Sequence, residues 1–193
     1  MSKQTKKITT IAMLTAIAAV LITLVHFPLF PAAAFLQYDP ADVAILIGAF
    51  AYGPVAGMII TVLASAIQAF LLGGDGVYGF LMHTIASGVL AVIAGIIYHR
   101  WHTRKGAVVA LSAGTLAMGL VMMGANHFIT PMFMGAPVAV VDAMLVPVIL
   151  PFNLLKAGIN SIITFLVYKT VSRHVIHGEG WEKKISGKVQ GDC

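Results

Sequence analysis

The hydrophobic positions of this chain form long runs that only short polar, proline- or glycine-containing segments interrupt. Most runs approach the roughly 20 apolar residues that a helix needs to cross a bilayer. They do not alternate with a period of two, as the strands of a membrane barrel would. The pattern therefore predicts an all-α integral membrane protein, because helices satisfy their own backbone hydrogen bonds in lipid.

The runs predict a bundle of six transmembrane helices, one of them short. The first run, residues 8–27, is too long for the core of a signal peptide and is expected to stay as a helix. Residues 42–72 hold two apolar pieces around Gly53-Pro54 but are too few for two full crossings, so one helix is short or the hairpin is shallow. The later segments are expected to be spans at 79–98, 106–125 and 147–169, with an irregular stretch at 126–142.

Composition and charge agree with this picture and add a topology. The chain has 193 residues, of which 59% are hydrophobic and 10% charged, and its mean hydropathy is +0.94. One membrane domain over residues 1–175 leaves only a polar, cytoplasmic tail at 176–193. In the six-helix arrangement almost every Lys and Arg falls on one side of the bilayer and Asp39, Asp42, Asp75 and Asp142 fall on the other. The positive-inside rule then places both termini in the cytoplasm, and the net charge of +5 does not indicate nucleic-acid binding.

The last predicted helix carries a narrow polar stripe. Asn153, Lys156, Asn160 and Thr164 fall within an arc of roughly 80° on a helical wheel, and the other faces are apolar. A lysine at membrane depth costs roughly 2.5 kcal/mol or more, so it should face the protein interior or a wet cavity. We expect this stripe to bind a polar, uncharged small molecule. The alternative is that Lys156 reaches the outer interface or is satisfied by backbone carbonyls at a helix break.

Other polar and aromatic residues are expected in the same outer half of the molecule. Amides donate to and accept from hydroxyl groups, lysine donates to carbonyl oxygens, and rings offer stacking surfaces. Such a set suits a planar heterocycle that bears a polyol. The candidates are Phe35, Gln37, Tyr38, His83, Asn126, His127, Thr130, Phe133, Asn153 and Lys156.

Two further patterns have structural interpretations. In Asp39-Pro40-Ala41-Asp42, an acid at the N-cap, proline at the first helical position and an acid at the third predict a helix start. Ala12, Ala16 and Ala19 form a strip of small residues that would let another helix approach closely, either within the bundle or from a partner.

Catalysis has little support in the sequence. His83 and Ser87 lie one turn apart, but no acid is evident beside them, so an intramembrane hydrolase is a weak alternative. The single Cys193 offers no disulfide or thiolate metal site, and we expect no metal or cofactor. No GxxxxGK[ST] motif occurs, so energy for uphill transport would have to come from another subunit.

Four segments together resemble the riboflavin-specific S component of energy-coupling factor (ECF) vitamin transporters. They are FLQYDPADVAILIGAFAYGPVAG, GFLMHTIASG, NHFITPMFMG and PFNLLKAGINS, the last preceded by Leu150. The likeness covers roughly residues 8–172. It implies a multi-pass protein of the bacterial cell membrane with six helices and a substrate pocket near the outer face.

The resemblance also implies a ligand, partners and site residues. Riboflavin would be the transported ligand, and the partners would be a transmembrane coupling subunit and two ABC-type ATPases. Sibling families share the fold but bind folate, pantothenate or other vitamins, so a different vitamin or a purine-like cargo stays open. Ala12 and Ala16 resemble the surface that docks on the coupling subunit. The ligand contacts that the resemblance implies are Leu36, Tyr38, Asn126, Asn153 and Lys156. His83 and Asn160, which the polar pattern singles out, complete the expected set.

Overall fold

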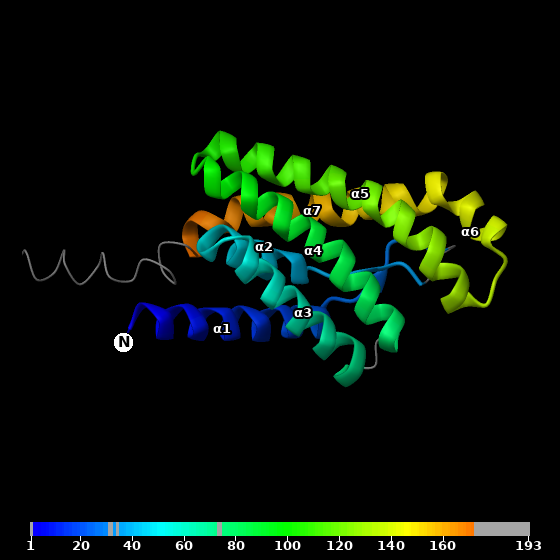
Figure 1. Ribbon diagram of the computed structural model, residues 1–193, viewed down its shortest axis with the longest axis horizontal. Helices are drawn as coiled ribbons and strands as arrows, with labels where there is room; N and C mark the ends of the chain where they lie inside the picture. The colour runs from blue at the N-terminus through cyan, green and yellow to red at the C-terminus, as the bar shows by residue number, and fades with distance from the viewer. Residues whose placement is uncertain (1, 31–32, 34, 73–74, 172–193) are drawn as a thin grey trace, which may run out of the picture.

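The computed structural model describes residues 2–30, 33, 35–72 and 75–171 of the chain. The predicted tail at 176–193 lies outside the described residues. The described part is a bundle of helices with one small two-stranded β-hairpin (Figure 1). The elements are α1 (Lys3–Leu24), β1 (Phe27–Pro28), β2 (Gln37–Tyr38), α2 (Ala41–Tyr52), α3 (Pro54–Leu71), α4 (Gly76–Arg100), α5 (Arg104–Met134), α6 (Val138–Met144), a π-helical turn (Leu145–Ile149) and α7 (Leu150–Val171).

The predicted membrane architecture is confirmed. Within the described residues five helical stretches are long and apolar enough to cross a bilayer, and α6, the π-helical turn and α7 together make up the fifth of them. The sixth helix, α2, has only 12 residues, as the length of the 42–72 segment predicts. Large apolar side chains such as Val20, Leu116 and Leu166 are exposed along the outside of the bundle, where lipid would cover them.

The short helix α2 lies in the centre of the bundle. It packs against α1, α3, α4 and α7, and every residue from Ala41 to Phe50 is buried. Gly53, with a φ of +91°, makes the turn that ends α2, and Pro54 is the first residue of α3. Because α2 is surrounded on all sides, polar groups at its start lie inside the protein.

Two predicted boundaries are wrong. The stretch 126–142 is not irregular, because α5 continues through Pro131 to Met134 and ends at Gly135 in the left-handed conformation. Pro131 lies three residues from the end of α5 and removes one backbone donor, which membrane helices tolerate where other groups satisfy the freed carbonyl. The helix expected to begin at residue 147 is part of a continuous helical stretch that begins at Val138, passes through the π-helical turn and becomes α-helical again at Leu150.

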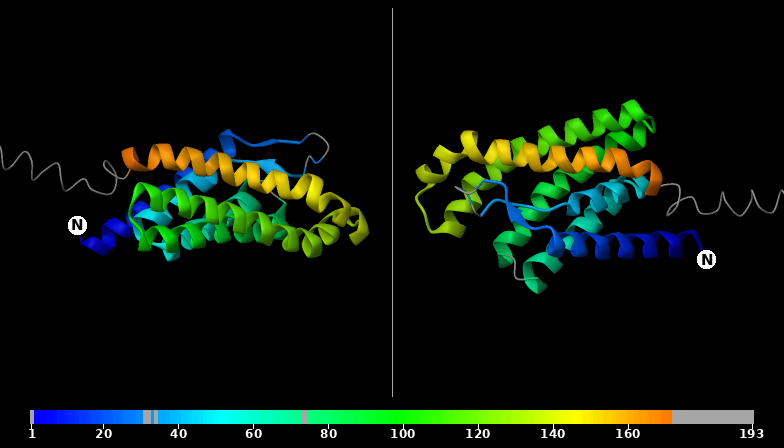
Figure 2. Two further views of the ribbon diagram at one scale, coloured as in Figure 1. Left: turned by 90° about the horizontal axis from the view of Figure 1, so that it is seen from above. Right: turned by 180° about the vertical axis from the view of Figure 1, so that it is seen from behind.

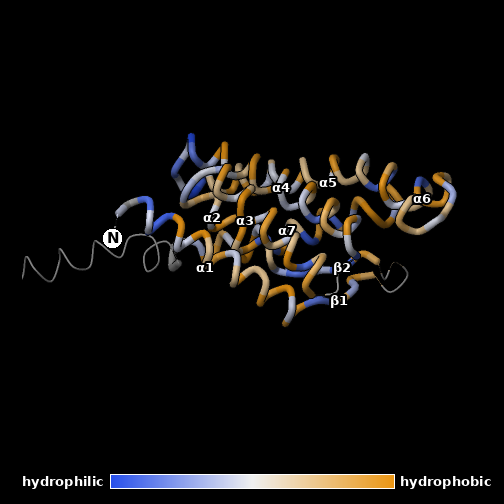
Figure 3. The backbone as a smooth tube through the Cα atoms, turned by 60° about the horizontal axis from the view of Figure 1, so that its bottom comes forward, coloured by the Kyte–Doolittle hydropathy of each residue, from blue (hydrophilic) through white to orange (hydrophobic). Residues whose placement is uncertain are grey.

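The ends of the bundle differ in character. The start of α1, the α4–α5 connection and the end of α7 lie together at one end, and α6 lies at the other (Figures 1 and 2). The first of these ends also carries hydrophilic backbone segments, among them the basic α4–α5 connection (Figure 3). The cytoplasmic location of this end stays a prediction from the charge pattern.

Candidate functional site

A cavity of about 200 Å³ lies in the half of the bundle that is remote from the N-terminus. Its walls come from the β2 segment, the end of α3, the start of α4, the second half of α5 and the start of α7. Five of the seven predicted ligand contacts line it, namely Leu36, His83, Asn126, Asn153 and Lys156. Other lining residues include Phe35, Gln37, Asp39, Gln68, Asp75, Tyr78, Met82, Met118, Thr130, Phe133 and Phe152.

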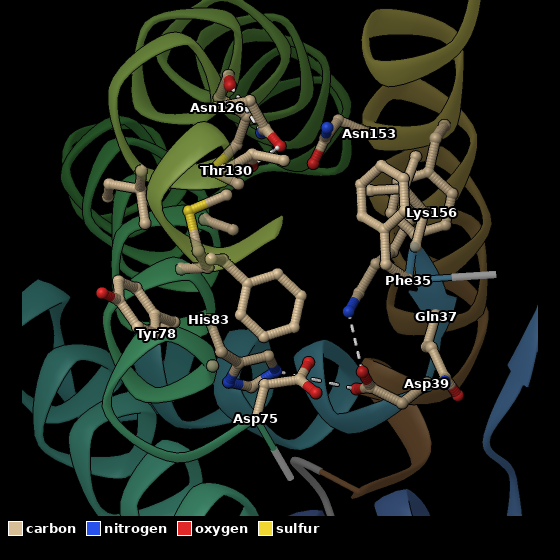
Figure 4. Close-up of a pocket in the computed structure, with 18 of the residues that line it drawn as sticks. Phe35, Gln37, Asp39, Asp75, Tyr78, His83, Asn126, Thr130, Asn153 and Lys156 are labelled. Carbon is tan, nitrogen blue, oxygen red and sulfur yellow. Dashed lines mark hydrogen bonds and ion pairs between the residues drawn. The ribbon is translucent and has the colours of Figure 1, made fainter. Parts of the chain in front are cut away.

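The polar stripe on α7 faces the protein interior, as predicted. Asn153, Lys156, Asn160 and Thr164 are all buried. The Lys156 ammonium lies 2.7 Å from Asp39 Oδ2, and the two side chains are 8% and 1% exposed (Figure 4). The stated alternative, a lysine that reaches the interface, is therefore wrong. A buried lysine that is paired and also lines a cavity can donate its remaining N–H groups to a ligand.

Asp39 has a larger role than helix capping. The helix starts one residue later than predicted, with Pro40 before Ala41, and Asp39 Oδ1 accepts a hydrogen bond from the backbone N–H of Ala41 at 3.1 Å. Burial alone would raise the pKa of the Asp39 carboxyl, but the Lys156 ammonium and His83 hold the pKa well below its ordinary value. Asp39 therefore carries a negative charge inside the bundle, opposite the lysine. Sequence reasoning missed this role because the capping pattern explained the residue already.

A second buried network lies beside this ion pair. Asp42 is fully buried and accepts hydrogen bonds from Ser87 Oγ and, at 3.0 Å, from Asn160 Nδ2. Asn160 also accepts from the Tyr38 hydroxyl at 2.9 Å and donates to the backbone carbonyl of Asp39. Burial raises the pKa of Tyr38, with Asp39 and Asp42 adding to the effect, so its hydroxyl stays neutral. The network ties the start of α2 to α4 and α7.

This network changes the interpretation of several residues. Asp42 was predicted to cap α2, but its carboxylate instead accepts hydrogen bonds from Ser87 and Asn160. Tyr38 and Asn160 were predicted to touch the ligand, but neither lines the cavity. They are hydrogen-bonded to each other behind the cavity wall that Asp39 and Lys156 form. Ser87 is bonded to Asp42 rather than to His83, whose Nδ1 lies 2.8 Å from Ser65 Oγ, so no nucleophile–base pair forms between Ser87 and His83.

Amide groups from α5 and α7 form one pole of the cavity (Figure 4). Asn126 Nδ2 donates to the Met122 carbonyl at 2.7 Å, and Asn126 Oδ1 accepts from the Thr130 hydroxyl at 2.8 Å. Asn153 Nδ2 donates in the same way to the Ile149 carbonyl at 2.8 Å. These bonds fix both amides, and each –NH₂ keeps a second donor. The pole can therefore bind the carbonyl and ring nitrogen groups of a heterocycle.

Acidic and imidazole groups form the opposite pole. In Figure 4, His83, Asp75 and Asp39 lie across the cavity from Asn126 and Asn153. His83 Nε2 lies 3.8 Å from Asp39 Oδ1, and Asp75 is exposed, at the mouth. Rings and thioethers such as Phe35, Tyr78, Met82 and Phe133 lie along the walls between the poles. The site offers hydrogen bonds at both poles and apolar surface between them.

The remaining predicted residues lie elsewhere. Ala12 and Ala16 are exposed on α1 and are not among the residues that line the cavity. His127 is not a lining residue but pairs with Asp142 of α6 at 2.6 Å. Among the described residues no group of three His, Cys, Asp or Glu side chains is placed to hold a metal ion.

Comparisons with known proteins give consistent matches over most of the chain. The family model "ECF transporter, substrate-specific component" matches residues 6–168. The chain is similar to the riboflavin transporter RibU of Staphylococcus aureus (strain TCH60), with 30% identity over 88% of this chain and 92% of the relative. It is also similar to the riboflavin transporter FmnP of Bacillus subtilis (strain 168), with 30% identity over 84% of this chain and 90% of the relative.

A solved structure gives the same result in three dimensions. The chain superposes on a structure described as "Structure and mechanism of the S component of a bacterial ECF transporter" with a TM-score of 0.79 and 29% sequence identity. The match covers 90% of this chain and 99% of the solved one. The arrangement of helices around the cavity is therefore shared with a protein of that description.

Proposed function

This chain belongs to the family of substrate-specific components of ECF transporters, and we propose that it captures riboflavin at the outer face of the membrane. The relatives named as riboflavin transporters support this choice of ligand. The charge pattern supports the location, because the residues that line the cavity lie in the half of the bundle remote from the basic segments. The protein is a membrane transport component and not an enzyme.

The observation that carries the proposal is the buried Lys156 ammonium at a cavity flanked by two fixed amides. A flavin ring system is planar and carries carbonyl oxygens and ring nitrogens along one edge. Asn126 and Asn153 can donate to or accept from that edge, Lys156 can donate to a ligand oxygen beside Asp39, and the aromatic and methionine walls can cover the faces of the ring. Leu36 and His83 complete the direct contacts, while Tyr38 and Asn160 support the wall behind Asp39.

The size of the cavity also bears on the bound state. At about 200 Å³ it is smaller than the roughly 300 Å³ at which sites for drug-sized ligands begin. We therefore expect the flavin to extend toward the mouth, where Gln37 and Asp75 are exposed lining residues. Charged or bulky additions at that end of the ligand would meet the Asp75 carboxylate.

Delivery of the ligand needs a partner that hydrolyses ATP. The sequence has no P-loop motif, and the outward face of α1 offers small exposed residues, Ala12 and Ala16, beside exposed Met13 and Ile17. We propose that a transmembrane coupling subunit with two ATPases docks on this face. A flat strip of small side chains permits close helix–helix contact in lipid.

The experiment that tests the ligand is spectroscopic. Purified protein should be yellow or should quench riboflavin fluorescence on titration with a saturable curve. Lys156→Met should weaken this binding, whereas Lys7→Met, which removes an exposed lysine at the opposite end of the bundle, should not. Protein that neither retains nor binds riboflavin, with a different vitamin seen by native mass spectrometry, would refute the proposed ligand.

A further inference from the structure

The cavity contains two buried polar atoms that have no hydrogen-bond partner in the protein. Among the described residues three buried side-chain atoms are without one, and two of them, Gln68 Oε1 and His83 Nε2, belong to residues that line the cavity. Gln68 comes from α3 and His83 from α4, so neither belongs to the amide pole on α5 and α7. Burying a polar atom without a hydrogen-bond partner is unfavourable, because the atom loses its bonds to water and gains none in return. Such atoms concentrated at one cavity indicate a ligand that supplies the partners.

We propose that Gln68 and His83 form a hydroxyl-binding subsite that holds the polyol tail of the ligand. This inference rests on the proposed function and adds a specificity-determining pair to it. His83 is already oriented, because its side chain is buried and its Nδ1 is paired at 2.8 Å with Oγ of Ser65 on α3. The Asp39 carboxylate, 3.8 Å from Nε2, favours the tautomer that carries the proton on Nε2. His83 is then a donor and Gln68 offers both an acceptor and a donor.

A hydroxyl group matches this arrangement better than other ligand groups do. Each hydroxyl accepts one hydrogen bond and donates another, so it can satisfy His83 and Gln68 together. A phosphate would lie near the carboxylates of Asp39 and Asp75, and like charges disfavour it. Because Gln68 Oε1 has no hydrogen bond within the protein, a ligand hydroxyl can donate to it without displacing a partner. The subsite therefore selects a neutral, hydroxylated tail.

The test compares riboflavin with lumiflavin, which has the same ring system but a methyl group in place of the ribityl chain. Dissociation constants are measured by flavin fluorescence quenching on the full chain in detergent. For Gln68→Leu and His83→Leu we expect riboflavin to bind about tenfold more weakly and lumiflavin to bind within about twofold of the native value. For Asn126→Leu, at the opposite pole, both flavins should bind more weakly. Unchanged lumiflavin binding also shows that a variant is folded.

Three outcomes would overturn the assignment. The first is unchanged riboflavin affinity in both Gln68→Leu and His83→Leu. The second is an equal loss for riboflavin and lumiflavin in these variants, which would place the two residues at the ring rather than the tail. The third is a native protein that binds lumiflavin as tightly as riboflavin. A native protein that binds neither flavin would instead refute the proposed function itself, and the tail subsite with it.

Discussion

The buried ion pair between Asp39 and Lys156 gives the sharpest prediction about stability. The two charged groups are 2.7 Å apart and almost completely buried. At an effective dielectric constant of about 20, this separation corresponds to an attraction of about 6 kcal/mol, most of which offsets the cost of burying both charges. Removing one partner leaves the other charge buried and unpaired. Asp39→Asn or Lys156→Met alone should therefore lower the free energy of unfolding by about 3–5 kcal/mol.

Removing both charges should have a much smaller effect. In the double variant Asp39→Asn/Lys156→Met no unpaired charge remains, so its stability should return to within about 1–2 kcal/mol of the native protein. Riboflavin binding should not return, because the Lys156 donor is gone. This separation of stability from binding distinguishes a ligand-contacting lysine from one that only holds the fold together.

The assay is thermal unfolding of the ligand-free protein in detergent at one scan rate, followed by tryptophan fluorescence. For a chain of this length, the single variants should unfold about 10 °C below the native protein. Asp142→Asn is the matched control, because Asp142 is 42% exposed in its pair with His127, and it should cost less than about 1 kcal/mol. Single variants as stable as that control, or a double variant whose loss equals the sum of the two single losses, would refute the reasoning.

Four further predictions follow from the same structure. Replacing Ala12 and Ala16 with Leu should stop cellular riboflavin uptake while the purified protein still binds riboflavin; normal uptake would contradict docking through α1. Asp75→Asn should raise the affinity for flavin mononucleotide relative to riboflavin in competition titrations, and an unchanged ratio would exclude Asp75 from this selection. Ser87→Ala should reduce thermal stability by leaving Asp42 with one donor fewer, with flavin binding retained at lower temperature. Since the pKa of Asp39 is depressed in the folded protein, its contribution to stability should be constant from neutral pH down to about pH 4 and be lost only in more acidic solution, as pH-dependent melting would show.

The helices were predictable because the bilayer leaves few alternatives. Apolar runs of about 20 residues must form helices in lipid, and the shortage of residues in the 42–72 segment correctly predicted a short helix. The extension of α5 was missed because Pro131 and Pro137 both appear as helix breakers in the sequence. In the structure Pro131 lies in the last turn of α5, and the helix ends only at Gly135 in the left-handed conformation.

The site was predictable for the residues whose burial is expensive. Lys156 and the amides beside it stand out because a charge in an apolar membrane helix is costly unless it is paired or faces a cavity. The partner of Lys156, by contrast, lies 117 positions away in the chain, and periodicity within one helix cannot reveal it. Gln68 was missed for a related reason, since a single amide on an apolar helix gives no pattern and becomes informative only when its lack of a hydrogen-bond partner beside a cavity is known.

A signal for the missing partners was nevertheless present in the length of α2. Twelve residues of α-helix span about 18 Å, little more than half of a hydrocarbon core of roughly 30 Å. If the turn at Gly53 lies near the basic end of the bundle, the first turn of α2 must lie at membrane depth, and so must Asp39 and Asp42. Two acids at that depth need donors or a cation, and the polar stripe of α7 is the part of the chain that supplies Lys156 and Asn160. The short helix thus explains why Asp39, which resembles a cap, lines the cavity while Asp42 lies buried behind it. A variant that lengthened α2 by one turn should disrupt the ion pair and the cavity together.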